Sequence, residues 1–286
     1  MIRRAGALGW PVFLLAGLVA SAASPAVQLA YAGAAILGFG MLHGASDLAV
    51  APRGSRPTLL VFYGSAVLLT LLWWRAEPFT ALVAFLLLSA AHFGRDDAPP
   101  SRPAERWCRA ALMIGGPALL HPATLAGLFA ALTGAPAASA LLVALLRGAA
   151  AVALAVLPFA AAGRARAERQ LLAVGVAALV LLPPLVGFAV AFTILHARPQ
   201  LAERMRALGC ARLPAYLRAT APVLAGAACV IAGAAWLFVD GPAPALSTVF
   251  AGLAALATPH MLAPSHWQGR DAAMPRADCR LRAMPD

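Results

Sequence analysis

The chain contains no lysine, and only 12% of its 286 residues carry a charge. Soluble globular domains have about 25% charged residues, so this chain has too few charges to cover a surface that faces water. Hydrophobic residues make up 62% of the sequence, and the mean hydropathy is +0.81. These values exclude an ordinary soluble protein and predict one that lies in a membrane.

All 22 basic residues are therefore arginine; with 11 acidic residues they give a formal net charge of +11. A protein that binds nucleic acid gathers such charge on one face or along one helix. Here the arginines are scattered, mostly in short connections between apolar stretches, so we expect no nucleic-acid partner. Because cytoplasmic loops are enriched in arginine, the charge instead indicates topology.

Cysteine is scarce, and the sequence indicates no second domain. Cys108, Cys210, Cys229 and Cys279 show no short CxxC spacing, which excludes a recognisable zinc or redox motif. No stretch repeats at a fixed period. We predict a single integral membrane domain over residues 1–286, with a polar cytoplasmic tail at 267–286.

Long apolar runs fill most of the chain. Pro57–Trp74, Ser139–Ala162 and Ala219–Val239 are each about 18 residues or longer, enough for a helix to cross a hydrocarbon core of ~30 Å. We predict an all-α, polytopic transmembrane helical bundle with about 8–10 membrane segments. The predicted helices lie at residues 8–23, 26–43, 57–74, 78–93, 110–133, 139–162, 170–196, 219–239 and 242–264.

The segment 170–196 is expected to be interrupted, because Pro183-Pro184 stands at its middle. Proline removes a backbone donor and disrupts a helix. One straight crossing would also place the arginine-rich connection 198–218 on the opposite side from the other arginine-rich loops. We therefore predict a broken or re-entrant helix around Pro183-Pro184 that returns the chain to the cytoplasmic side.

Four of the six histidines lie where predicted membrane helices end. An ionisable side chain in or near lipid costs free energy unless it is paired, hydrogen-bonded or metal-bound, so such residues indicate function. The predicted topology places all four on the cytoplasmic side of the inner (plasma) membrane. Neutral imidazole suits iron, copper, nickel or zinc, and a structural zinc site would include cysteine. The predicted metal ligands are His43, His92, His196 and His260.

Asp47 follows His43 by four residues, so both would share one face of a continuing helix. Metal-bound histidines commonly donate their second ring nitrogen to a carboxylate, which makes Asp47 a candidate partner. An acid at a helix end that faces water or an arginine is the alternative. Asp96 and Asp97 are weaker candidates for the same role.

The two remaining histidines are left out of the predicted metal set. His121 precedes Pro122 and indicates a kink, and His266 beside Trp267 is typical of a headgroup contact. Aromatic residues in the apolar stretches are candidates to line a tunnel for an apolar substrate. Phe93 and Phe192 are the two next to the predicted ligands.

Four stretches, taken in order, resemble the bacterial membrane-bound β-carotene 15,15′-dioxygenase family (the Brp/Blh group). They are Gly40–Asp47, Ala91–Asp97, Leu195–Arg198 and Pro259–Leu262. The resemblance implies an iron(II) enzyme that splits the central double bond of a β-carotene-like carotenoid with dioxygen, giving retinal. Its substrate would be dissolved in the lipid bilayer.

One position departs from the family pattern. The third motif of the family usually carries a second histidine, four residues after the first, that is thought to bind iron; here that position is Gln200. A glutamine amide is a poor iron ligand. The resemblance therefore implies either that His260 completes the coordination or that one position is open, with Gln200 beside the iron.

Other functions stay open from the residues alone. A bis-histidine haem protein would need only two facing histidines. A transporter, or an accessory protein in carotenoid or rhodopsin assembly, would use the histidines as proton relays. The predicted spans contain no substantial network of acidic residues, and Asp47 is the nearest candidate, which disfavours a transporter. The sequence does not indicate an oligomeric state.

Overall fold

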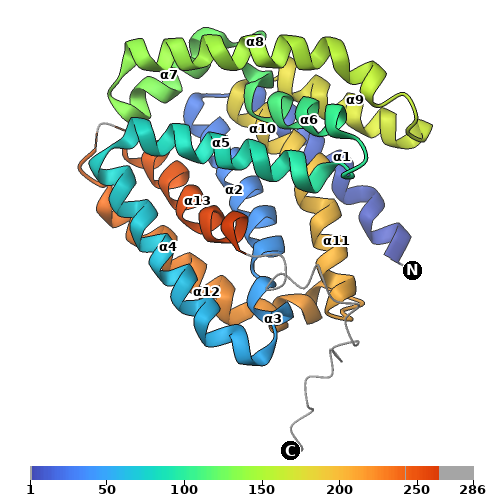
Figure 1. The fold of residues 1–286 in the computed structure, drawn as a ribbon, viewed down its shortest axis with the longest axis vertical. Coiled ribbons are helices and arrows are strands. Elements are labelled where there is room, and N and C mark those ends of the chain that lie inside the picture. The colour runs from blue at the N-terminus through green and yellow to red at the C-terminus, as the bar shows by residue number, and fades with distance from the viewer. Residues whose placement is uncertain (1, 242, 264–286) are drawn as a thin grey trace, which may run out of the picture. The chain divides into compact units, whose positions relative to one another are not determined.

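The structure, a computed structural model, describes residues 2–241 and 243–263, with side chains from residue 12 onward. Every regular element within these ranges is a helix, and they contain no strand (Figure 1). The predicted all-α class is confirmed. The tail predicted at 267–286, together with His266 and Cys279, lies outside the described residues.

Seven helical stretches of the described chain are long and apolar enough to cross a membrane. A further pair, Pro103–Ala118 and Pro122–Thr133, is bent by 91° and would add an eighth if it forms one span. The protein is thus a multi-pass membrane protein, at the lower end of the predicted number of segments. The seven stretches are Pro25–Val50, Arg53–Ala76, Pro78–Asp97, Pro136–Ala160, Pro184–Ala207, Leu213–Leu237 and Pro244–Leu262.

The described residues form two compact units. The first unit contains residues 2–37 and 86–196, and the second contains residues 38–85 and 197–263 apart from 242. Helices α2 (Pro25–Gly44) and α5 (Pro78–Asp97) contribute to both units. The single domain expected over residues 1–286 stays a prediction.

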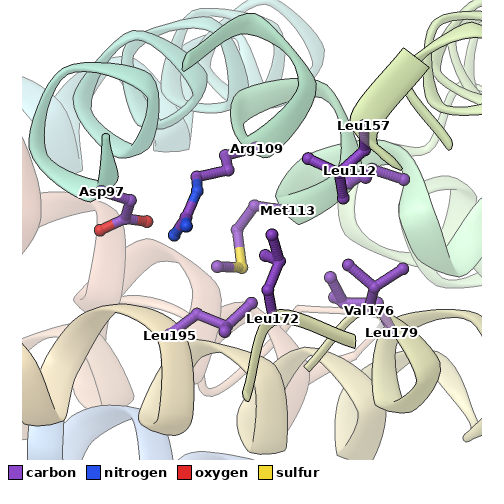
Figure 2. Close-up of a pocket in the computed structure, with 9 residues that line it drawn as sticks. All are labelled: Asp97, Arg109, Leu112, Met113, Leu157, Leu172, Val176, Leu179 and Leu195. Atoms are coloured by element: carbon purple, nitrogen blue, oxygen red, sulfur yellow. The ribbon is translucent and has the colours of Figure 1, made fainter. Parts of the chain in front are cut away.

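The first unit is built around α8, which packs along α6 and α7, while α10 packs on α9 and α1. Its core includes Cys108, Leu112, Ala150 and Leu157. Leu112 and Leu157 also line a small cavity, drawn in Figure 2. The elements are α1 (Ile2–Ser21), α6 (Pro103–Gly115), η2 (Gly116–Ala118), α7 (Pro122–Thr133), α8 (Pro136–Ala160), α9 (Arg166–Leu181), α10 (Pro184–Ala191) and the π-helical η3 (Phe192–Ala197).

The predicted break at Pro183-Pro184 is confirmed. Helix α9 ends at Leu181 and α10 begins at Pro184, because the residues between them are extended, with ψ of 157° and 146°. Proline pushes the residue before it out of the helical region. Helix α10 then packs on α9 so closely that a Cβ on Gly187 would lie 2.5 Å from the carbonyl oxygen of Ala178.

Other predicted boundaries were wrong. The helix expected at 110–133 is instead α6 and α7, which meet at a sharp bend before Pro122. His121 lies at this bend and donates a hydrogen bond from Nε2 to the Leu181 carbonyl at 3.3 Å. Residues 94–109 and 198–218, which lie between predicted helices, contain the start of α6 and all of α11 (Arg198–Ala207). These helices were not predicted because their arginines interrupt the apolar pattern of the sequence. Charged residues on one face do not prevent a helix from forming.

The second unit centres on α13 (Pro244–Leu262), which packs between α4 (Arg56–Ala76) and α12 (Leu213–Leu237). The buried face of α13 carries small residues such as Ala251, Gly252 and Ala255, and small residues let membrane helices approach closely. The short helices α3 (Asp47–Val50) and η1 (Arg53–Ser55) complete the unit.

Candidate metal centre

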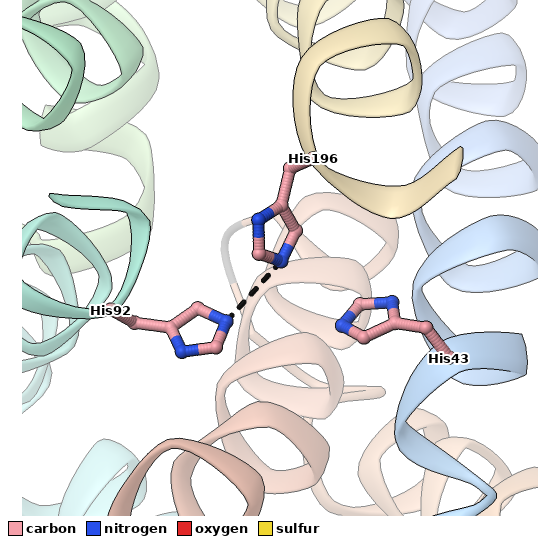
Figure 3. A group of neighbouring side chains, drawn as sticks. All are labelled: His43, His92 and His196. Carbon is pink, nitrogen blue, oxygen red and sulfur yellow. Dashed lines mark hydrogen bonds between the residues drawn. The ribbon is translucent and has the colours of Figure 1, made fainter. Parts of the chain in front are cut away.

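His92 and His196 face each other in the first unit. His92 lies near the end of α5 and His196 lies in the π-helical segment η3, and their Nε2 atoms are 3.2 Å apart (Figure 3). Both side chains are buried. Short π-helical turns are rare and frequently occur at functional sites. The structure thus brings two of the four predicted ligands into direct contact.

Two carboxylates at the end of α5 lie close to the Nδ1 atoms of these imidazoles. Asp97 Oδ1 is 2.7 Å from Nδ1 of His196. Because a carboxylate only accepts, Nδ1 of His196 carries the proton and Nε2 carries the lone pair. Nδ1 of His92 lies 3.4 Å from both Asp96 Oδ2 and Arg95 Nη2. Sequence reasoning ranked these acids below Asp47. The spacing of four residues from His92 to Asp96 was the available signal, whereas Asp97 and His196 are 99 residues apart.

Aromatic rings surround His196. The ring centroids of Phe93 and Phe192 lie 4.9 Å and 5.5 Å from that of His196. Phe188, which sequence reasoning missed, stacks on Phe192 at 5.8 Å with an angle of 17° between the rings. Its position one helical turn before Phe192 could have revealed it. The three phenylalanines form an apolar wall beside the imidazole.

Asp47 is the centre of a buried polar cluster in the second unit. Its Oδ2 accepts a hydrogen bond from Nδ1 of His260 at 2.5 Å and another from the hydroxyl of Tyr63. Arg204 Nη2 lies 3.3 Å from Oδ1. The carboxylate, the imidazole and the guanidinium are all buried, so each charge is compensated inside the protein. Arg204 was not a candidate from the sequence, and Tyr63 was only one of the aromatic residues expected to line a tunnel.

The expected face shared by Asp47 and His43 does not form. Helix α2 ends at Gly44 and α3 begins at Asp47. Between them, the Ser46 hydroxyl donates to the carbonyl of His43 at 3.0 Å. The intervening turn changes the direction of the side chain, so the carboxylate of Asp47 bonds His260 instead.

His43 and His260 also lie together in the second unit, with ring centroids 5.2 Å apart and an angle of 79° between the rings. Nδ1 of His43 is 3.4 Å from the carbonyl oxygen of Phe39, one turn earlier in α2. Because that oxygen only accepts, the lone pair of His43 lies on Nε2. Gln200 is half-buried in α11, and its proposed place beside a metal stays a prediction.

The chemistry of these donors fits a metal ion. In His43, His196 and His260 an oxygen acceptor holds Nδ1–H, which leaves Nε2 as the ligand atom; this is the usual arrangement behind metal-bound histidine. Imidazole nitrogens suit iron. A haem between His92 and His196 does not fit, because bonds of about 2 Å on each side of an iron would separate the two nitrogens by about 4 Å, and they are 3.2 Å apart.

Comparison with known proteins identifies the family of this chain. The family model described as Beta-carotene 15,15'-dioxygenase matches residues 34–268. This range contains the four histidines predicted to bind a metal, together with Asp47, Asp96 and Asp97. No curated protein and no solved structure matches the chain. Because the family match covers most of the sequence, the chain belongs to the beta-carotene 15,15′-dioxygenase family.

Proposed function

We propose that this protein is a membrane-embedded non-haem iron oxygenase that cleaves a β-carotene-like carotenoid at its central double bond with dioxygen, giving retinal. The observation that carries the proposal is the pair of buried imidazoles, His92 and His196, with a carboxylate behind each, in a chain of this family. In a membrane protein such buried ionisable groups are costly unless they have a function.

In this proposal His43, His92, His196 and His260 bind one Fe²⁺, which when bound supplies the activation of dioxygen. The protein's part is to keep the ligand atoms in place. Asp97 holds Nδ1 of His196, and Asp47 holds Nδ1 of His260. Each carboxylate fixes both the tautomer and the direction of the imidazole, so Nε2 is ready to bind a metal.

The proposed substrate has no polar group by which the protein could hold it. Its selection would depend on the shape of an apolar surface and on hydrophobic burial. Phe93, Phe188 and Phe192 supply such a surface beside His196. The carotenoid would enter from the bilayer in which it is dissolved, and the proposed site would lie toward the cytoplasmic side of the inner (plasma) membrane.

Expression of the full chain in a bacterium that accumulates β-carotene tests the proposal. We expect the pigment to bleach and retinal to appear. The purified protein should contain iron and show no Soret band. Good expression with neither bleaching nor retinal would contradict the proposed substrate, and a Soret band would contradict the non-haem centre.

A further inference from the structure

The cavity in the first unit ends on two charged side chains. Seven of its nine lining residues are apolar, among them Leu112, Leu179 and Leu195, and the other two are Asp97 and Arg109. Figure 2 shows the carboxylate and the guanidinium at the same end of this space. Its volume is about 10 Å³, which is close to the space that one water molecule needs.

Asp97 uses only one of its oxygens within the described part of the chain. Oδ1 accepts the proton of His196 Nδ1, whereas Oδ2 is buried and has no hydrogen-bond partner there. The side chain is 3% exposed. A buried carboxylate oxygen without a partner is costly, and the side chain that carries it is one of the two charged groups that line a cavity of about the volume of one water.

Arg109, at the same end of the cavity, has N–H groups that are not used in its contacts with Glu105. Its Nε and Nη2 contact Oε1 of Glu105 at 2.9 Å and 2.8 Å. A guanidinium carries five N–H groups, so those of Nη1 have no acceptor among the described residues. The side chain is 12% exposed, which favours a partner inside the protein over bulk water.

Glu105 holds the guanidinium of Arg109 in place. Its carboxylate is completely buried and also accepts from Nε of Arg164 at 3.1 Å and 3.2 Å. Burial opposes the charge on Arg164, but its hydrogen bonds with Glu105 outweigh this and raise its pKa. Arg102 lies farther away, at 3.7 Å, and does not line the cavity.

We propose that Arg109 is a positioning residue for His196, and that it acts through one water molecule bound in the cavity between its guanidinium and Oδ2 of Asp97. The water would satisfy the second carboxylate oxygen and stop the carboxylate from rotating. Asp97 would then hold His196 in a single tautomer, with the proton on Nδ1. The chain of contacts runs from His196 to the turn between α8 and α9. The inference rests on the proposed function only where it concerns a metal on His196.

The test compares Arg109→Met with Arg102→Met in full-length protein in detergent micelles. Both changes remove an arginine from Glu105, but only the first removes a cavity-lining group. In metal-free protein with ¹⁵N-labelled histidine, the ring of His196 is identified as the signal lost in His196→Gln. We expect one tautomer in the parent and in R102M, and a mixture in R109M. The iron affinity should fall about tenfold in R109M and stay within about twofold of the parent in R102M.

Identical spectra and affinities for the two variants would overturn the proposal. A density map of the parent protein gives a second measurement that does not depend on variants folding. A water between Asp97 and Arg109 supports the proposal, and direct contact between the two side chains or an empty cavity overturns it. The tautomer of His196 is measured in metal-free protein. The expected difference between the two variants can therefore be observed even if the protein binds no iron and the proposed function is wrong. Conversely, if the protein is an active iron enzyme and the tautomer of His196 does not change in R109M, this inference is wrong and the proposed function stands.

Discussion

Asp47 and His260 are 213 residues apart in the chain and are joined by a hydrogen bond of 2.5 Å between Oδ2 and Nδ1. The same carboxylate faces the buried guanidinium of Arg204. It therefore balances one charge and orients one imidazole at the same time. Each of these two roles can be tested separately.

Asp47→Asn removes the charge and keeps an oxygen acceptor. We expect the free energy of unfolding to fall by about 3–5 kcal/mol, because Arg204 loses its buried counterion. Iron affinity should fall about 10–100-fold. Tyr63→Phe is the matched control, since it removes only one hydrogen bond from the carboxylate and should cost about 0.5–1.5 kcal/mol. Equal effects of the two variants in denaturation and iron titrations would contradict the central role of Asp47.

His92→Gln and His196→Gln should each abolish retinal formation and remove iron from the purified protein. Glutamine keeps the bulk and polarity of the side chain but loses the imidazole ligand. His121→Gln is the control, because His121 bonds a backbone carbonyl at the bend between α6 and α7. It should keep its iron. Full iron occupancy in H92Q or H196Q, measured by elemental analysis, would show that the metal site is assigned wrongly.

Phe188→Ala should impair turnover of the carotenoid without changing the iron content, because it removes one ring of the apolar wall beside His196. Phe159→Ala offers a comparison, since Phe159 is 82% exposed on α8. We expect a rise of about tenfold or more in KM for F188A, equivalent to about 1.4 kcal/mol, and none for F159A. A loss of iron in F188A would point to a structural role for the ring instead.

Gln200→His tests the departure from the family pattern. If His260 completes the coordination, His260→Gln should lose most of its iron, and adding Gln200→His to it should restore part of the affinity. Gln200→His alone should change the affinity little. The three variants can be compared by competition with a chelator. An iron affinity that does not change in His260→Gln but changes in Gln200→His would contradict the assignment of His260 as a ligand.

Glu105→Gln should be strongly destabilising, by about 3–5 kcal/mol, because it leaves Arg109 and Arg164 without a buried counterion. Glu168→Gln is the control: the side chain of Glu168 is 55% exposed, and its ion pair with Arg164 measures 3.4 Å. Such an exposed pair contributes about 0–1 kcal/mol. Similar thermal unfolding of both variants would show that burial of Glu105 does not matter.

Much of the fold could be predicted from apolar run length, because a membrane helix needs little else. The break at Pro183-Pro184 was predictable because proline acts locally. The kink indicated by His121-Pro122 is a bend of 91°, which divides the predicted helix 110–133 into two. Helices α6 and α11 were missed, because ion pairs such as Arg109–Glu105 form only in the folded chain.

The proposed ligands of the candidate site could be singled out from the sequence, but the residues that contact them could not. Histidines at helix ends stand out because they are costly there. Which acid supports which histidine depends on contacts between distant segments, and local spacing misled for Asp47. It bonds His260 because α2 ends at Gly44. Asp97 reaches His196 across 99 residues, a pairing that no local pattern encodes.

The last turn of α5 carries His92, Asp96 and Asp97, and so serves both imidazoles of the first unit. One residue inserted between His92 and Asp96 would rotate everything after it by about 100° around the helix axis. Asp96 would then move away from His92 into the position of Asp97, and Asp97 would leave His196, although no amino acid of the site had been replaced. The length of this turn is therefore as strict a requirement as its chemistry, and homologues should tolerate substitution here more readily than a gap.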